Sequence, residues 1–507
     1  MKNRKKFLVS FALIVALILT FIVNMDNLYA GNEPENEESI NQFTEHLNDR
    51  ITSIMKTYQI PGVSIALIHR GEMVWSNAYG YADVEAGREM TVDTVCRVES
   101  ISKSVTAWGV MKLLEDGQIQ LDEPVHQYLA NWEIPKSRFS EEDITIRQLL
   151  SHSSGMPLGT IGLEYSPEDS IPSLENSLSR QAKLVREPGT AFEYSNVGFN
   201  LLELLIEKVT GVKFSDYMEE EVLEPLGMNS ARFEWSEDID PEVPMGYDLQ
   251  GDPVPLYVYS EKGSGGMFAH VEDVARFVMA GMEGSKLTES RVLQSSSIEE
   301  MYTPVMDISG IYGMVAEGYG LGYFVENTAE GKKAVFHGGQ GHGWMTHFHY
   351  FPEEGEGIVI LTNSQRSWPF ISYILKDWSQ WALSSQVGMN KILWGVVGMW
   401  VVIGLIALGS MALLYGTGKG VYRRHRSFTI LSKQAMVTRS VKSGLGLGMM
   451  FAVIWSSKQK YLFLSSIFPL AFDWLIYSIV VFSLALLLSI LFPETDSREK
   501  RITTNRT

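Results

Sequence analysis

A serine and a lysine stand three residues apart within Val98–Ser104, which reads Val-Glu-Ser-Ile-Ser-Lys-Ser. The residues that follow have the apolar spacing of a helix, which Asp116 and Gly117 end. Ser100 therefore falls in the first turn, and Lys103 lies one turn further along on the same face. Backbone N–H groups at a helix N-terminus can stabilise a negative oxygen, and a buried lysine amine can take a hydroxyl proton. The pair predicts a serine nucleophile with a lysine base.

The same Ser-x-x-Lys spacing also occurs at 53–56, 457–460 and 497–500, so the pair needs partners elsewhere in the chain. Tyr194 and Asn196 form the one Tyr-x-Asn motif in the sequence. We expect a phenol near a lysine ammonium to lose its proton more easily and to relay protons to a leaving group. The Asn196 amide can both donate and accept, which suits holding Lys103 and a substrate amide. The alternative is a capped helix start whose tyrosine packs on the core.

A third candidate is the stretch 337–343, His-Gly-Gly-Gln-Gly-His-Gly, where one predicted strand ends before Trp344 begins the next. Glycines let a backbone edge approach a substrate closely, and such an edge can donate N–H groups to an acyl oxygen. The candidate site residues in this stretch are His337, Gly338, Gly339 and Gln340.

Taken in this order, the three motifs resemble those of the β-lactamase-related serine hydrolases. These form the class C β-lactamase-like group, which includes low-molecular-weight penicillin-binding proteins, D-aminopeptidases and esterases. The resemblance covers about residues 45–385. Four further segments of the sequence agree with it, at 149–157, 225–228, 265–267 and 318–322.

The resemblance implies a role for each motif. Ser100 would be acylated, Lys103 and Tyr194 would share general-base and general-acid work, and Asn196 would orient the substrate and Lys103. The backbone N–H groups of Ser100 and Gln340 would form the oxyanion hole. Water or an amine acceptor would then open the acyl-enzyme, and no cofactor is implied.

One residue departs from the family pattern. Many true β-lactamases have lysine at the position of His337, where a permanent ammonium helps bind the substrate carboxylate. A histidine is mostly neutral at pH 7. We therefore expect a small-molecule or peptide substrate and peptidase or esterase activity, with a penicillin-binding or β-lactam-hydrolysing protein as the alternative.

The elements that must position these residues suggest an α/β (α+β) fold of the β-lactamase/transpeptidase type. The pattern predicts helices at about 40–58 and 367–383 and a mostly helical middle over roughly 140–310. Strands flank that middle on both sides, so we expect one antiparallel sheet flanked by helices, with an inserted helical subdomain. The predicted strands are 63–68, 74–79, 319–325, 333–336, 344–351 and 357–362.

The two ends of the chain predict a membrane protein. Residues 1–30 suit a signal peptide or N-terminal anchor, 31–44 an acidic linker, and 45–388 the catalytic domain. We expect a membrane domain over 389–507, with C-terminal transmembrane helices at 392–415, 443–457 and 474–492. A strongly basic loop after the first span predicts a multi-pass protein of the cell membrane, with its catalytic domain extracellular.

Composition argues against some functions. The net charge is −18 although both ends are basic, so the middle is strongly acidic, which disfavours binding to nucleic acid. Cys96 is the only cysteine, so the chain has no intrachain disulfide, and for an exported protein this favours a bacterial source. We expect Cys96 to be a small residue of the core.

Three other functions compete with the hydrolase. Four histidines within thirteen residues suggest a metal site, but no carboxylate or cysteine completes a familiar zinc pattern, and we predict no metal. A catalytically idle binding or sensor module usually loses a catalytic residue, whereas all are present here. The membrane spans carry almost no charge, so anchoring is expected rather than transport. The four histidines are His337, His342, His347 and His349.

Overall fold

The computed structural model describes residues 39–159, 163–236, 243–283, 292–310, 312–429, 436–458 and 463–494. Contacts within the chain divide it into two compact units. One is formed by residues 32–392, and the other contains the helices that follow Ile392. The predicted signal peptide or anchor at 1–30 and most of the predicted linker at 31–44 lie outside the described residues.

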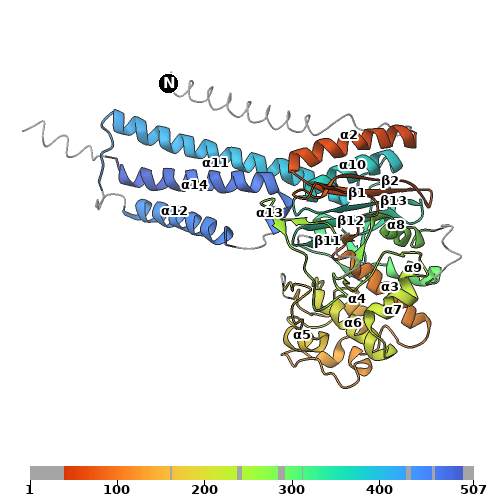
Figure 1. Cartoon of the computed structure of the whole chain (residues 1–507). Helices are drawn as coiled ribbons and strands as arrows, with labels where there is room; N and C mark the ends of the chain where they lie inside the picture. The colour runs from red at the N-terminus through yellow and green to blue at the C-terminus, as the bar shows by residue number, and fades with distance from the viewer. Residues whose placement is uncertain are drawn as a thin grey trace, which may run out of the picture. The chain divides into compact units, whose positions relative to one another are not determined.

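An antiparallel sheet is the centre of the larger unit (Figure 1). Its order is β3-β2-β1-β13-β12-β11-β10-β9-β8, and β1 pairs directly with β13, from Val63 opposite Thr362 to Ile68 opposite Gly357. The sheet is therefore built from both ends of the unit, as the sequence predicts. Its strands are β1 Gly62–His69, β2 Glu72–Asp83, β3 Arg88–Glu89, β8 Met306–Asp307, β9 Gly318–Tyr319, β10 Phe324–Asn327, β11 Lys333–Gly341, β12 Trp344–Phe351 and β13 Glu356–Thr362.

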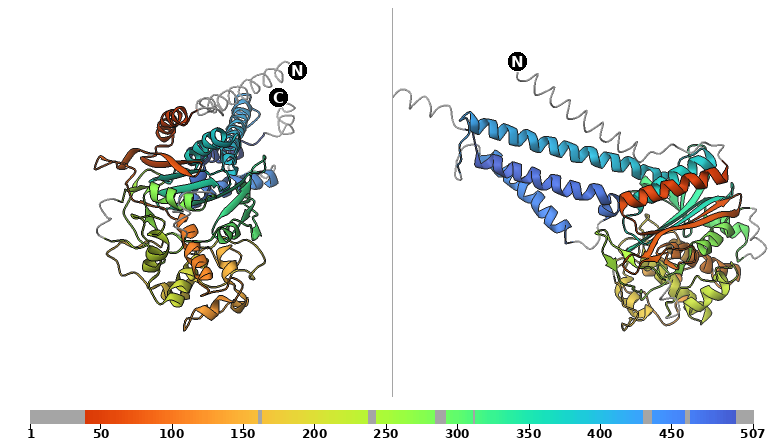
Figure 2. Two further views of the ribbon diagram at one scale, coloured as in Figure 1. Left: turned by 90° about the vertical axis from the view of Figure 1, so that its right-hand side faces the viewer. Right: turned by 45° about the horizontal axis from the view of Figure 1, so that its top comes forward.

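Helices cover both faces of this sheet (Figures 1 and 2). On one face α2 (Ile40–Tyr58) packs on α10 (Trp368–Leu383), and both segments are helices as the sequence predicts. A buried ion pair joins them, with Arg50 Nε 2.8 Å from Asp377 Oδ2. On the other face lie α3 (Ile101–Glu115) and α8 (Val271–Ala280).

The segment between the two groups of strands contains helices, loops and several two-residue strands, so it is less helical than predicted. Cys96 is fully buried in the core, as expected. The remaining elements of this unit are β4 Cys96–Arg97, η1 Val125–Tyr128, η2 Glu141–Asp143, α4 Ile146–Leu150, α5 Leu174–Gln181, α6 Asn196–Thr210, α7 Phe214–Met218, η3 Glu219–Leu223, β5 Gly246–Tyr247, β6 Pro253–Val254, β7 Phe268–Ala269, α9 Ser295–Met301, η5 Tyr312–Met314 and η6 Gly388–Asn390.

Two predicted strands were wrong in extent. The run 319–325 is not one strand, because a turn in which Gly320 N donates to Tyr323 O separates β9 from β10. The strand predicted to end at 336 continues as β11 to Gly341, where it pairs with Trp344. The His-Gly-Gly sequence is therefore part of a strand, since its ladder to β12 satisfies the backbone that we expected in a loop.

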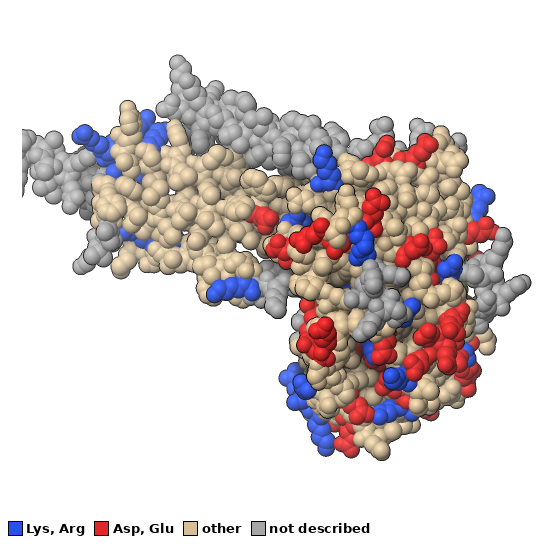
Figure 3. Space-filling model, in the orientation of Figure 1, with Lys and Arg blue, Asp and Glu red and all other residues tan. Residues whose placement is uncertain are grey.

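The second unit consists of α11 (Lys391–Tyr422), α12 (Met436–Ser456), α13 (Phe463–Ile467) and α14 (Pro469–Leu491). Among the described residues, two helices are long and apolar enough to cross a membrane, Gly388–Tyr422 and Pro469–Leu491. Figure 3 shows the long uncharged surface of these helices. The helix α12, which covers all but the last residue of the predicted span 443–457, is not among these candidate spans, and Arg439 and Lys442 lie in its first two turns.

Candidate active site

The first turn of α3 brings Ser100 and Lys103 together, as their spacing predicts. Lys103 is fully buried, and its Nζ donates to Ser100 Oγ at 3.0 Å and to the backbone oxygen of Ser264 at 2.6 Å. The loop that carries Ser264 is itself fixed, because buried Glu203 of α6 accepts from two of its backbone N–H groups at 2.6 and 2.7 Å. The amine is therefore aimed at the serine hydroxyl.

The environment of Lys103 suits it to act as a base at neutral pH. Burial lowers the pKa of its amine from 10.5 to about 7, and attraction to Glu99 opposes part of that change. About half of the molecules would then hold a neutral amine at pH 7. This agrees with the expectation that burial allows the lysine amine to take the hydroxyl proton at neutral pH.

Tyr194 lies next to this pair, immediately before α6. Lys103 Nζ is 5.0 Å from the centroid of its ring, and a side-chain hydrogen bond with Ser100 acts on its phenol. The expectation that the lysine would make this phenol more acidic was wrong. Burial, together with neighbouring Tyr312, raises the pKa of Tyr194, and Ser100 offsets only part of that rise. The phenol therefore keeps its proton at neutral pH.

Asn196 begins α6, whose first turn is capped by the Ser195 side chain, an acceptor from Gly198 N at 2.9 Å. Its backbone N–H donates to Leu158 O at 3.1 Å. Within the described part of the chain, its amide makes no hydrogen bond to Lys103. The backbone oxygen of Ser264 occupies that role, and the sequence gives no sign of it beyond the glycines that follow it.

The β11 strand contributes a buried histidine and an open backbone. His337 is fully buried, with Nε2 3.1 Å from the Tyr319 hydroxyl and Nδ1 2.9 Å from Gly338 O. Burial and the nearby Lys103 lower its pKa to about 3, so it is neutral, as predicted. A Cβ on Gly339 would lie only 2.2 Å from the backbone oxygen of Val98, which shows how closely β11 approaches the segment that leads into Ser100.

Two of the predicted substrate-binding residues in β11, Gln340 and Gly338, face α10 and not Ser100. The Gln340 side chain accepts from Trp368 Nε1 of α10 at 3.1 Å, and a Cβ on Gly338 would meet the same indole at 2.7 Å. Only their backbone groups remain as candidates for the site.

His152, in the loop after α4, is a site neighbour that motif reasoning missed. Its Nδ1 accepts from Ser195 N at 3.1 Å, and its ring centroid lies 4.3 Å from that of Tyr194. Burial lowers its pKa, so it is a neutral support beneath the tyrosine. The signal was available in the Ser151–Gly155 phrase, which the resemblance included without assigning it a function.

Two further histidines of the cluster, His347 and His349, lie on the side of the sheet that α10 covers. His347 and His349 share one face of β12, with Nε2 of the first 3.3 Å from Nδ1 of the second. This is the face covered by Trp368 and Trp378 of α10. Among the described residues, no cluster of three or more histidine, cysteine or acidic side chains is placed to hold a metal ion.

A helix-flanked antiparallel sheet, with a Ser-x-x-Lys helix packed against it, defines the fold class shared by β-lactamases and penicillin-binding proteins. The chain belongs to the β-lactamase family, whose model matches residues 47–372. Members of this family are generally serine hydrolases.

Individual proteins give the same result. The chain is 27% identical over 334 residues to protein flp of Staphylococcus aureus (strain MRSA252), covering 64% of this chain and 63% of that relative. It is 24% identical to penicillin-binding protein 4* of Bacillus subtilis (strain 168), covering 66% and 74%. The chain thus spans less than two thirds of the length of the staphylococcal relative.

Solved structures share the fold. The octameric penicillin-binding protein homologue from Pyrococcus abyssi superposes with a TM-score of 0.54 at 32% identity, covering 63% of this chain and 73% of that one. A class C β-lactamase carrying a tyrosine-to-phenylalanine substitution superposes with a TM-score of 0.54 at 22% identity, covering 64% and 92%.

Proposed function

We propose that the protein is a membrane-anchored extracellular serine hydrolase that acts through an acyl-enzyme on Ser100. The observation that carries this proposal is the pairing of a buried amine with a hydroxyl, at 3.0 Å between Lys103 Nζ and Ser100 Oγ. An amine with a pKa of about 7 can accept the hydroxyl proton as the oxygen attacks an ester or amide carbonyl.

The remaining residues then have distinct tasks. The backbone N–H groups of Ser100 and Gln340 stabilise the oxyanion, and Asn196 holds the substrate. Tyr194, which stays protonated, donates a proton to the leaving group and takes back from Lys103 the proton that the amine accepted from Ser100. Water, or an amine acceptor, releases the acyl group by the reverse path. His337 supports the site as a neutral group.

The neutral state of His337 favours esters and peptides over β-lactams. A fully buried imidazole with a pKa of about 3 offers no positive charge to a substrate carboxylate. The alternative, a penicillin-binding or β-lactam-hydrolysing protein, is supported by the name of the Bacillus subtilis relative. A third reading, an idle binding module, predicts that Ser100 is never acylated.

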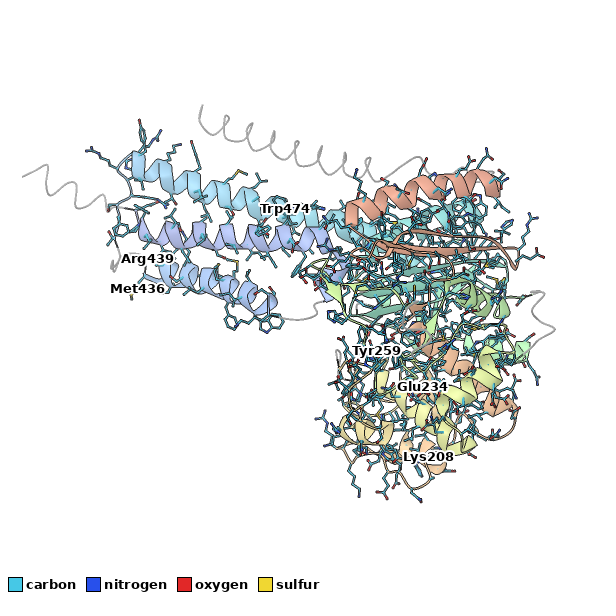
Figure 4. All side chains as sticks on the ribbon, viewed as in Figure 1. Lys208, Glu234, Tyr259, Met436, Arg439 and Trp474 are labelled. Carbon is cyan, nitrogen blue, oxygen red and sulfur yellow. The ribbon has the colours of Figure 1, made fainter. Side chains whose placement is uncertain are left out.

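The membrane anchor is also part of the proposal. The two apolar helices, and the basic residues that follow the first of them, suit a multi-pass protein with residues 45–388 outside the cell. Within the helical unit, Arg439 and Trp474 lie towards opposite ends (Figure 4), as expected for a basic cytoplasmic end and an aromatic outer boundary.

Turnover of a substrate panel tests the proposed activity. The full chain in detergent is incubated with p-nitrophenyl esters, D-amino-acyl amides and a fluorescent penicillin, with Ser100→Ala as the control. We expect ester or D-amino-acyl turnover that Ser100→Ala abolishes, with little penicillin adduct. Dominant penicillin acylation would favour the alternative, and identical behaviour of both proteins with every compound would favour the binding module.

A further inference from the structure

Glu99, the residue directly before Ser100, is a buried carboxylate that belongs to none of the three motifs. It is 3% exposed, and its backbone lies in the left-handed region with a φ of 53°. This conformation is unfavourable for a residue other than glycine, so contacts around Glu99 must hold it in place.

Three donors fix the Glu99 carboxylate. Arg97 Nε donates to Oε1 at 3.0 Å, the Tyr257 hydroxyl donates to Oε1 at 3.1 Å, and the Tyr259 hydroxyl donates to Oε2 at 3.0 Å. Arg97 is 1% exposed, and its guanidinium carbon lies 4.2 and 4.7 Å from the centroids of the two tyrosine rings. Tyr259 is labelled in Figure 4, between the sheet and the inserted helices. Arg97 and Glu99 thus form a buried ion pair that the two tyrosines enclose.

The same carboxylate fills space that the glycines of β11 leave open. A Cβ on Gly339 would lie 2.9 Å from Glu99 Cβ, and a Cβ on Gly341 would lie 2.3 Å from Glu99 Cδ. On its other side, the Glu99 backbone oxygen accepts from Ser102 Oγ at 2.6 Å. Glu99 therefore links the corner that carries the nucleophile to the strand that carries Gln340.

We propose that Glu99 is a positioning residue for acylation, whose charged side chain fixes Ser100 against β11 and attracts the proton carried by Lys103. This inference rests on the proposed acyl-enzyme function. One carboxylate serves both purposes, because the contacts that hold it in place also keep a negative charge near enough to act on the Lys103 amine.

Charge around Lys103 supports this role. Glu99 raises the pKa of Lys103, against the larger lowering by burial. The other titratable side chains that face the amine are Tyr194 before α6, His152 after α4 and His337 on β11, and burial keeps all three neutral at pH 7. Glu99 is thus the charged group that acts on the amine, with its own charge balanced in part by Arg97.

The test is the pH dependence of Ser100 labelling by a fluorophosphonate, measured on the full chain in detergent for wild type and Glu99→Gln. In this reaction Ser100 Oγ bonds to phosphorus, the P–F bond breaks, fluoride leaves and the hydroxyl proton passes to Lys103. We expect Glu99→Gln to move the midpoint of the labelling rate to lower pH. We also expect its maximal rate to fall by about 10- to 100-fold, as for a slightly misplaced nucleophile.

Glu326→Gln is the matched control, since Glu326 is also buried but bonds Gly388 N and lies beside His349 on the face covered by α10. It should change neither the midpoint nor the maximal rate. A folded Glu99→Gln that labels like wild type would overturn the role of Glu99, whereas a wild type that never labels at Ser100 would overturn the proposed function itself.

A second variant keeps the test decisive if Glu99→Gln does not fold, as judged by circular dichroism. Tyr259→Phe removes one hydrogen bond to the carboxylate but no charge. It should lower the maximal rate and leave the midpoint unchanged. A Tyr259→Phe protein with the wild-type rate would overturn the positioning role.

Discussion

Acid should inactivate the protein through Lys103, and the pH at which it does so identifies the base. Only the neutral amine can accept the Ser100 proton. With a pKa of about 7, half of the amine is neutral at pH 7, and the neutral fraction falls by about tenfold for each pH unit below that. The rate of Ser100 acylation should therefore rise with pH through about 7 and level off at higher pH.

The assay is kcat/KM for an ester, or the fluorophosphonate labelling rate, between pH 5 and 9. Two neighbours do not titrate in this window, because the pKa of Tyr194 is raised and that of His337 is about 3. Lys103→Arg, which stays charged, should be inactive at every pH. A rate that keeps rising towards 10.5, the ordinary value for lysine, would show that the amine is solvated and would refute the reasoning.

Three further outcomes follow from the same contacts. Lys103→Met should abolish labelling yet raise the free energy of unfolding at pH 7 by at most about 5 kcal/mol, because it removes a buried amine with a strongly lowered pKa. Denaturant titrations measure this change, and a destabilised protein would contradict the prediction. Gly339→Ala should destabilise by about 1–3 kcal/mol and slow labelling, since its Cβ would overlap the Val98 oxygen, whereas Gly198→Ala, with ordinary contacts only, should be tolerated. Asp377→Ala should cost about 3–5 kcal/mol by leaving Arg50 buried and unpaired, and a melting temperature equal to wild type would show that the pair contributes nothing.

Much of the fold was predictable because its elements have strong local signals. The helix predicted over 40–58 is α2 to the residue, and the strands predicted at 344–351 and 357–362 correspond to β12 and β13. These segments are long, apolar and bounded by turn residues. The extent of β11 was not predictable, because glycines that usually mark a loop are here paired across a ladder with β12.

The candidate site divides in the same way. Residue types and spacing were enough to bring Ser100, Lys103 and Tyr194 together, since each belongs to a short motif. The direction of the Tyr194 pKa was not predictable, because it depends on burial among rings distant in sequence. The same holds for the Ser264 oxygen and its partner Lys103, and for Glu99 and its two tyrosine partners, because each pair is separated by about 160 residues and meets only in the folded chain.

The most direct test is to locate the covalent adduct. The full chain is labelled with a fluorophosphonate at pH 8, digested and mapped by mass spectrometry beside Ser100→Ala and Ser102→Ala. We predict one adduct on Ser100, present in Ser102→Ala and absent from Ser100→Ala. An adduct on another residue, or equal labelling of wild type and Ser100→Ala, would contradict the assignment of the nucleophile.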